Sequence, residues 1–341
     1  MSDEEHGSDD DIGSSHSAVS DDGYIFLDSD IKDDVVLPFQ ADEAGARGRL
    51  VRLGNTVDKI LSDHDYPDGV ATYLGEAIAL TCLIGASLKF DGKLILQSKT
   101  DGPISMLVVD YTTPGKLRGY ASYNKAAVAE LEADGVEHEI GSWLGRGYLA
   151  LTVDQGADME RYQGIVAVER DFLGTVAEDY FMQSEQIPSL VRLNVAKHYN
   201  ADAGDDGKHW HWRAGGLLVQ YLTREGGHDY DSDEPFENFE EDWNRARMLG
   251  ETVEAHELLD PELAPERLLL RLYHEEGVRI FDKVPVQAEC SCSRDKVQNM
   301  LSHFSSDERG KMIEMTGKIS VTCEFCTSTY EFSETDFEVK S

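Results

Sequence analysis

Four cysteines near the C-terminus form two close pairs, and their type and spacing point to metal chemistry. Cys290 and Cys292 are separated by one residue, Cys323 and Cys326 are separated by two, and thirty residues lie between the pairs. Zinc prefers four soft ligands at the corners of a tetrahedron, and two closely spaced pairs provide them with little loop strain. The sequence therefore predicts one zinc ion per chain, bound by these four thiolates.

Alternative interpretations of the same thiols are four unrelated cysteines, two structural disulfides, or a thioredoxin-like dithiol at Cys323 and Cys326. The thioredoxin motif needs a helix to begin after its first cysteine, whereas residues 327–330 are β-prone. The N-terminus shows no basic segment followed by an apolar run, so we expect a cytoplasmic, reducing location in which thiols bind metal. The fifth cysteine, Cys82, lies in an apolar segment and is predicted to be an inert core residue.

Two predicted β runs hold the second cysteine pair, as in a zinc knuckle on a hairpin. Residues 318–322 precede Cys323, and residues 327–332 follow Cys326. The residues between the two pairs, 293–315, have a helical pattern. We therefore expect a small C-terminal module whose fold depends on its metal.

Other groups of potential ligands are weaker candidates. Residues 229–233 together with Glu240 imitate a calcium loop, but Glu234 stands where the sharp turn needs glycine, so a solvated acidic loop is favoured. His209 and His211 could chelate a metal, yet no third ligand is evident, and a surface or strand pair is the simpler interpretation. His303 lies between the cysteine pairs and could compete as a ligand. No motif for nucleotide binding, hydrolysis or group transfer is present.

The larger part of the chain is predicted to be an α+β domain with an antiparallel sheet. Residues 70–88 are apolar apart from Glu76 and a few small polar residues, a length that borders on a membrane span. The central glutamate and the absence of flanking basic clusters favour a helix buried in a core. A second helix is predicted over residues 171–183. Strand-like runs occupy residues 93–98, 104–111, 117–121, 148–153, 165–168 and 217–222.

Amphipathic helices are predicted between this domain and the cysteines. Apolar residues recur at near-helical spacing from Phe239 to Leu258 in a very acidic background, and Asp260-Pro261 should end that helix. Pro265 begins another helix, whose apolar stripe runs to Tyr273. Because like charges weaken these helices, we predict a linker that is stable only while a surface covers its stripes.

Charge excludes several functions. Acidic residues outnumber basic ones by 66 to 31, which gives a formal net charge of −35. Such a chain repels nucleic acid and anionic membranes, so neither is expected as a partner.

The cysteine pattern resembles that of the thirty-three-kilodalton heat shock protein family, the redox-regulated holdase chaperones of bacteria. The resemblance covers residues 34–333. The sequence departs from the family pattern in its long acidic N-terminus and in a charged insert at 225–240. Supporting stretches are Val51-Arg52-Leu53, Gly75-Glu76-Ala77, Asp101-Gly102-Pro103, Tyr162-Gln163-Gly164-Ile165-Val166 and Ser184-Glu185-Gln186-Ile187-Pro188.

The resemblance implies a mechanism without enzymatic turnover. It implies that oxidation converts the four ligands into the disulfides Cys290–Cys292 and Cys323–Cys326, that zinc leaves, and that the chain then holds unfolding proteins without ATP. It also implies a homodimer of the oxidised form and transfer of clients to an ATP-dependent foldase. Rival hypotheses are a zinc-ribbon module of transcription or translation, and a dithiol oxidoreductase.

The predicted organisation has five parts. Residues 1–34 form an acidic, disordered tail, and residues 35–224 form the chaperone core. Residues 225–285 form the acidic insert and the metastable helical linker. Residues 286–333 form the zinc-binding switch, and residues 334–341 form a short tail.

Overall fold

The structure is a computed structural model of the whole chain. It describes residues 18–19, 25–26, 33–88, 91–136, 140–156, 159, 161–169, 172–202, 207–222 and 237–337. The chain divides into two units, Met1–Ile31 and Lys32–Ser341. In the first unit, β1 (Ala18–Val19) pairs with β2 (Ile25–Phe26). Most of the predicted tail, and residues 229–233 of the calcium-like loop, lie outside the described residues.

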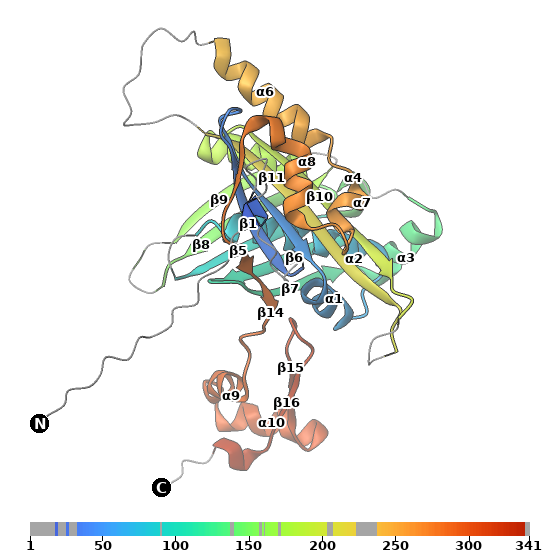
Figure 1. The fold of residues 1–341 in the computed structure, drawn as a ribbon. Helices are drawn as coiled ribbons and strands as arrows, with labels where there is room; N and C mark the ends of the chain where they lie inside the picture. Colours follow the sequence, from blue (N-terminus) through green and yellow to red (C-terminus); the bar gives the residue numbers. More distant parts are fainter. Residues whose placement is uncertain are drawn as a thin grey trace, which may run out of the picture. The chain divides into compact units, whose positions relative to one another are not determined.

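Two six-stranded sheets form the body of the second unit (Figure 1). The first has the order β10-β11-β4-β3-β12, with β13 also paired to β3, and all of its pairs are antiparallel. Its strands are β3 (Val35–Ala41), β4 (Ala46–Leu53), β10 (Ser189–Tyr199), β11 (Trp210–Tyr221), β12 (Val278–Ile280) and β13 (Val284–Pro285).

The second sheet has the order β14-β7-β6-β5-β8-β9. Its pairs are antiparallel except that β14 runs parallel to β7, so the chain joins this sheet immediately before the first cysteine pair. Its strands are β5 (Lys93–Thr100), β6 (Ile104–Thr112), β7 (Lys116–Tyr123), β8 (Gly147–Asp154), β9 (Tyr162–Val168) and β14 (Gln287–Ala288).

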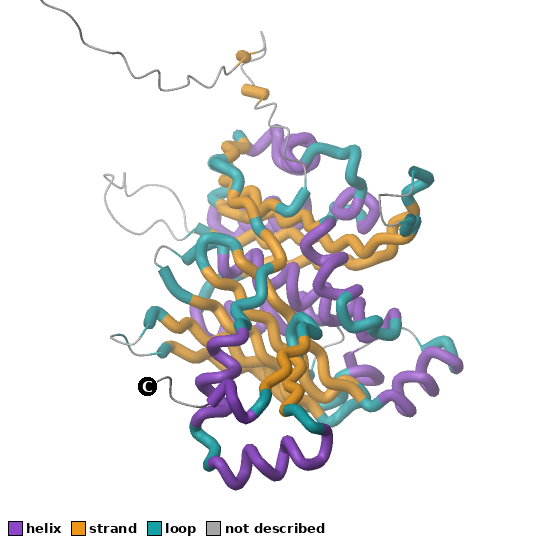
Figure 2. The backbone as a smooth tube through the Cα atoms, turned by 90° about the horizontal axis from the view of Figure 1, so that it is seen from below, coloured by secondary structure: helices purple, strands orange, loops and turns teal. Residues whose placement is uncertain are grey.

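The apolar segment of the sequence forms α2 (Asp68–Gly85), which packs against strands of both sheets. Contact on several sides explains why it is apolar almost all round. Among the described helices it alone is long and apolar enough to cross a membrane, but 78% of it is buried within the fold. The remaining helices of the body are α1 (Asn55–Ser62), α3 (Lys125–Ala133), α4 (Ile140–Trp143), α5 (Leu173–Tyr180) and the π-helical turn Phe181–Glu185. Figure 2 shows these helices (purple) packed against the strands (orange). The predicted α+β class with antiparallel pairing is confirmed.

The linker helices lie on the first sheet, on the face away from α2. They are α6 (Glu237–Glu251), α7 (Ala255–Leu259) and α8 (Pro265–Tyr273), followed by a 3-10 turn at His274–Glu276. The single helix expected from Phe239 to Leu258 is in fact broken after Glu251. Glu254 is the N-cap of α7, and its amide donates to the Glu257 carboxylate at 3.0 Å, a start signal that sequence periodicity does not reveal.

The C-terminal module has a much smaller core than the body. It contains α9 (Arg294–Ser302), α10 (Ser306–Thr316), β15 (Ile319–Thr322), β16 (Thr329–Phe332) and a 3-10 turn at Glu334–Phe337. The helical region expected at 293–315 is divided because Ser305 caps the start of α10. The buried residues of its apolar cluster are Leu301, Ile319 and Phe332.

Candidate metal centre

The four C-terminal thiols converge, although they come from two segments of the chain. Their Sγ atoms all lie within 4.8 Å of one another. The shortest separations join the two pairs: Cys290 Sγ lies 3.7 Å from Cys323 Sγ, and Cys292 Sγ lies 3.3 Å from Cys326 Sγ. The cluster is half-buried at the junction of β14, α9 and the β15–β16 hairpin.

Backbone hydrogen bonds shape the hairpin loop that carries the second pair. The Cys323 amide donates to Ser328 O at 2.9 Å, and the Thr327 amide donates to Cys323 O at 2.9 Å. Thr327 has a φ of 56°, a left-handed conformation that closes the loop. The strands pair from Ile319↔Phe332 to Thr322↔Thr329, so both cysteines lie in the loop between them. The predicted zinc knuckle on a hairpin therefore has its expected backbone.

The donor set fits a zinc ion. Zinc–thiolate bonds of about 2.3 Å in a tetrahedron put neighbouring sulfurs about 3.8 Å apart. The observed separations of 3.3 and 3.7 Å, within an overall limit of 4.8 Å, are close to this spacing. Four soft sulfurs select zinc over hard cations such as calcium and magnesium.

Local contacts give the thiols different acidities. Burial raises the pKa of Cys292 to about 12, although a hydrogen bond to the Tyr330 hydroxyl at 3.2 Å opposes this rise. Burial also acts to raise the pKa of Cys326, but hydrogen bonds with the hydroxyl and amide of Ser328 outweigh it and hold the pKa at about 7. The pKa of Cys326 therefore lies below that of Cys292. A bound cation would favour the thiolate form of all four sulfurs.

The histidine candidates are used elsewhere. His303 Nδ1 is 2.8 Å from Asn299 O, and His303 does not belong to the group of clustered ligands.

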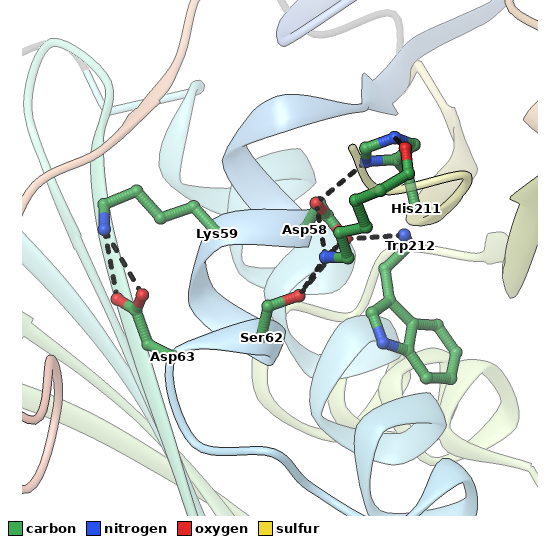
Figure 3. Close-up of polar contacts among 7 residues, drawn as sticks. Asp58, Lys59, Ser62, Asp63, His211 and Trp212 are labelled. Atoms are coloured by element: carbon green, nitrogen blue, oxygen red, sulfur yellow. Dashed lines mark hydrogen bonds and ion pairs between the residues drawn. The ribbon is translucent and has the colours of Figure 1, made fainter. Parts of the chain in front are cut away.

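His211 lies on β11, where its Nδ1 is 3.2 Å from Asp58 and its Nε2 is 2.9 Å from Lys208 O. Figure 3 shows that Asp58 of α1 also accepts from the Trp212 amide, so this polar group fastens α1 to β11. The ring of His209 stacks on Tyr199. Within the described part of the chain, the four cysteines are the one group of possible metal ligands.

Cys82 lies on α2 in the apolar core, and burial raises the pKa of its thiol well above the ordinary value. Such a thiol does not react at neutral pH.

Two arginines that sequence analysis did not single out as functional hold the linker on the body. Arg52 of β4 is fully buried, and its guanidinium donates to the backbone oxygens of Asp260 and Leu263. Arg213 of β11 donates to Leu259 O at 2.6 Å and forms a two-bond ion pair with Asp33. Both arginines therefore satisfy carbonyls at the end of α7 that would otherwise lack partners. The one sign of this role in the sequence was the position of Arg52 between the apolar residues Val51 and Leu53.

Comparisons with known proteins confirm the family resemblance. A family model described as "Hsp33 protein" matches residues 34–333. The chain belongs to the Hsp33 family. It is 43% identical over 307 residues to the 33 kDa chaperonin of Caulobacter vibrioides, covering 90% of this chain and 97% of that protein. It is 35% identical over 305 residues to the 33 kDa chaperonin of Shewanella loihica, covering 89% and 94%.

A solved structure extends the Hsp33 likeness to the fold. The crystal structure of the 33 kDa chaperonin of Thermotoga maritima matches with a TM-score of 0.70 and 21% identity, over 89% of this chain and 96% of that one. The family thus defines the chain as a chaperone associated with stress.

Proposed function

We propose that this chain is a redox-regulated holdase that binds unfolding proteins without ATP and does not act as an enzyme. The convergence of four thiols from two segments into one metal-sized cluster carries the proposal. Cys290, Cys292, Cys323 and Cys326 would hold one zinc ion in the reduced state. The ion would cross-link four sulfurs in a module that has only a small apolar core, which is how structural zinc sites contribute to folding.

Oxidation of the four ligands would switch the chain on. Each pair would react in the same way: two thiols and one hypochlorous acid give one disulfide, one hydrogen chloride and one water. The family resemblance implies the pairs Cys290–Cys292 and Cys323–Cys326. The shortest separations join Cys290 to Cys323 and Cys292 to Cys326, so geometry alone does not select the pairing. Sulfurs held in disulfides are poor ligands, and the module would then lose its metal and unfold.

The short strands β12, β13 and β14 would relay that unfolding to the linker. They connect α8 to Cys290, and they contain only three, two and two residues. β12 and β13 pair with β3 at the edge of the sheet that carries the linker. If the module pulls this segment away, α6 to α8 would lose their C-terminal attachment, and their apolar stripes and the sheet surface beneath would become available to clients. We further propose a cytoplasmic location, a homodimer of the oxidised form and release of clients to an ATP-dependent foldase.

The test compares reduced, zinc-loaded chain with oxidised chain in an assay of light scattering by a thermally unfolding protein, without nucleotide. We expect suppression of scattering only by the oxidised chain, with one zinc released per chain to a chromogenic chelator. Proteolysis and mass spectrometry without reduction would identify the disulfides. Equal suppression by the reduced, zinc-loaded chain would refute redox control.

A further inference from the structure

The outward face of β7 is the surface that contacts the metal module. Lys116, Arg118 and Tyr120 alternate along β7 on its partly exposed face, and we call them the β7 stripe. Lys116 forms an ion pair with Glu289 at 2.6 Å, and Arg118 donates to the Ser291 hydroxyl at 3.2 Å. These contacts place the start of the first cysteine pair directly on the second sheet.

The stripe also holds the two residues between Cys323 and Cys326. The guanidinium carbon of Arg118 lies 4.0 Å from the centre of the Phe325 ring, a cation–π contact, and the Tyr120 ring centre lies 6.3 Å from it. Glu324 and Tyr120 line the same pocket, and the Glu324 carboxylate raises the pKa of the Tyr120 hydroxyl. The stripe therefore recognises an acidic residue followed by an aromatic one.

The body of the protein builds this surface without help from the module. Arg118 is fixed by Asp110 of the neighbouring strand at 2.7 Å, and the Asp110 side chain is only 8% exposed. Tyr120 packs against His64, whose ring stacks on Tyr66 at 4.9 Å. Because these partners all belong to the body, the stripe should keep its shape when the module unfolds.

The same surface is unusual in its charge. The chain has a net charge of −35, yet Lys116, Arg118 and Lys125 lie on or next to the stripe. A pocket of about 350 Å³ adjoins it, and Glu324 and Thr327 of the module form part of its wall. Its lining from the body consists of His64, Tyr66, Tyr120, Ala121, Ser122, Tyr123 and Lys125. Departure of the module would open this pocket and leave an aromatic floor with cations beside it.

We infer that the β7 stripe is a peptide-binding site that Glu324 and Phe325 occupy in the folded chain, and that client segments with a carboxylate beside an aromatic ring take their place after oxidation. This inference rests on the proposed function, since it requires the module to leave. The module then acts as an internal competitor. Its tether gives it a high effective concentration, so free peptide cannot displace it while the module is folded.

A labelled peptide tests the site directly. The probe is the segment from Val321 to Tyr330 with serine at both cysteine positions, and its binding to full-length chain is followed by fluorescence anisotropy. We expect the reduced, zinc-loaded chain to bind at least about tenfold more weakly than the oxidised chain, because the module occupies the stripe. Peptides with alanine for the phenylalanine, or lysine for the glutamate, should each bind oxidised chain about tenfold more weakly.

Variants of the body locate the binding. Arg118→Lys keeps the charge and the pairing with Asp110 but loses the planar stacking surface, so we expect about threefold to tenfold weaker binding. Tyr120→Phe removes the hydroxyl that shares a pocket with Glu324 and should also weaken binding. The matched control is Arg161→Lys, next to β9 at the far edge of the same sheet, where the arginine is paired with Asp154 at 2.9 Å, and its binding should be unchanged. Unchanged binding by both stripe variants, or by the alanine peptide, would overturn the inference.

Competition separates this inference from the proposed function. A thermally unfolded protein added to saturation should displace the peptide from oxidised chain. Suppression of aggregation without peptide binding, or without displacement, would refute the stripe as a client site and leave the holdase function intact. Peptide binding with the expected ratios in a chain that does not suppress aggregation would refute the holdase function instead.

Discussion

The linker and the metal module are both small helical additions to the body, but different forces hold them. The linker buries Ala246, Leu258 and Tyr273, among other residues, against the first sheet, and two arginines bind its backbone. The module has three buried residues in its apolar cluster and four clustered thiols. One region is held by ordinary packing and hydrogen bonds, and under the proposed function the other would depend on a metal held by its four thiols.

Under the proposed function, this difference would make the module the sensor of oxidation and the linker the region that responds. A region held by many apolar contacts does not respond to an oxidant, because oxidation changes none of those contacts. A region held through four sulfurs responds completely, since the oxidant removes its ligands. Control of the linker by oxidation therefore requires that the module and the linker be connected, as β12, β13 and β14 connect them.

The largest expected effect is the loss of one sulfur ligand. Structural zinc contributes on the order of 10–16 kcal/mol to small modules, so Cys292→Ser should weaken zinc binding by more than about a hundredfold and unfold residues 290–337. A zinc assay and hydrogen exchange provide the measurements. The matched control is Cys82→Ala, which removes a core thiol and should leave one zinc per chain. Full zinc affinity in Cys292→Ser would show that the module uses another ligand, and His303 would be examined next.

Substitution of Arg52 should weaken the attachment of the linker to the first sheet while zinc binding stays the same. Arg52→Met would leave the half-buried carbonyls of Asp260 and Leu263 without the donors that Arg52 provides, at a cost of about 2–3 kcal/mol. We expect faster hydrogen exchange over residues 237–277 and partial holding by the reduced chain, with one zinc still bound. Arg47→Met, at an exposed position on the same strand, is the control. If residues 237–277 stay equally protected in both variants, the arginines do not hold the linker.

A pH scan should affect the body and the module in opposite directions. Burial in the core raises the pKa of Glu76 on α2 from 4.5 to about 8, so the folded body holds this proton more tightly than the unfolded chain does. The associated stability is complete below about pH 4.5 and is lost as the pH rises through about 8. Metal binding to thiols instead strengthens as the pH rises.

The variant Glu76→Gln isolates this effect in denaturant titrations. Its stability advantage over the unaltered chain should grow between pH 5 and pH 8, while zinc affinity should be the same in both chains at each pH. A constant difference between the two chains across that range would mean that the Glu76 carboxyl is already solvated.

The sequence predicted best the features that depend on residue type alone, such as clustered cysteines or a long apolar segment. Four cysteines in two close pairs predicted the cluster that the structure brings together, and hydropathy predicted α2. The strands β3, β10 and β12 were missed, because most of their pairing partners are distant in sequence. The contact of the linker with the first sheet could not be predicted either, since an amphipathic stripe indicates that a surface exists but does not identify it.

Glu254 shows how local structure can reverse an expectation about charge. From composition alone, Glu254→Lys should stabilise the linker by relieving repulsion among acidic residues. In the structure Glu254 is the N-cap of α7, where its amide donates to the Glu257 carboxylate at 3.0 Å. Lysine would replace a negative charge with a positive one at the positive end of the helix, so the change should destabilise the linker by about 0.3–1 kcal/mol.

Two glycines, one in the linker and one in the module, allow the two regions to be compared through the smallest expected effect. Glycine inside a helix costs about 0.5–1 kcal/mol relative to alanine, so an unhindered Gly→Ala change should be stabilising. A Cβ on Gly310 of α10 would meet nothing within 4 Å. A Cβ on Gly250 of α6 would lie 2.7 Å from the Tyr273 hydroxyl, which is buried and donates to Ala246 O at 3.1 Å. The same substitution should therefore have opposite signs in the two regions.

We expect Gly310→Ala to stabilise the module by about 0.5–1 kcal/mol, and so to slow its unfolding after oxidation while zinc stoichiometry stays the same. Gly250→Ala should instead loosen α6 from the sheet, because Tyr273 cannot move without losing its hydrogen bond, and hydrogen exchange in residues 237–277 should quicken. Hydrogen exchange measured on both variants, before and after oxidation, tests the two effects. Stabilisation by both substitutions would show that α6 is not packed tightly enough for Tyr273 to oppose a methyl group, and the linker would then resemble the module in being held by little apolar packing.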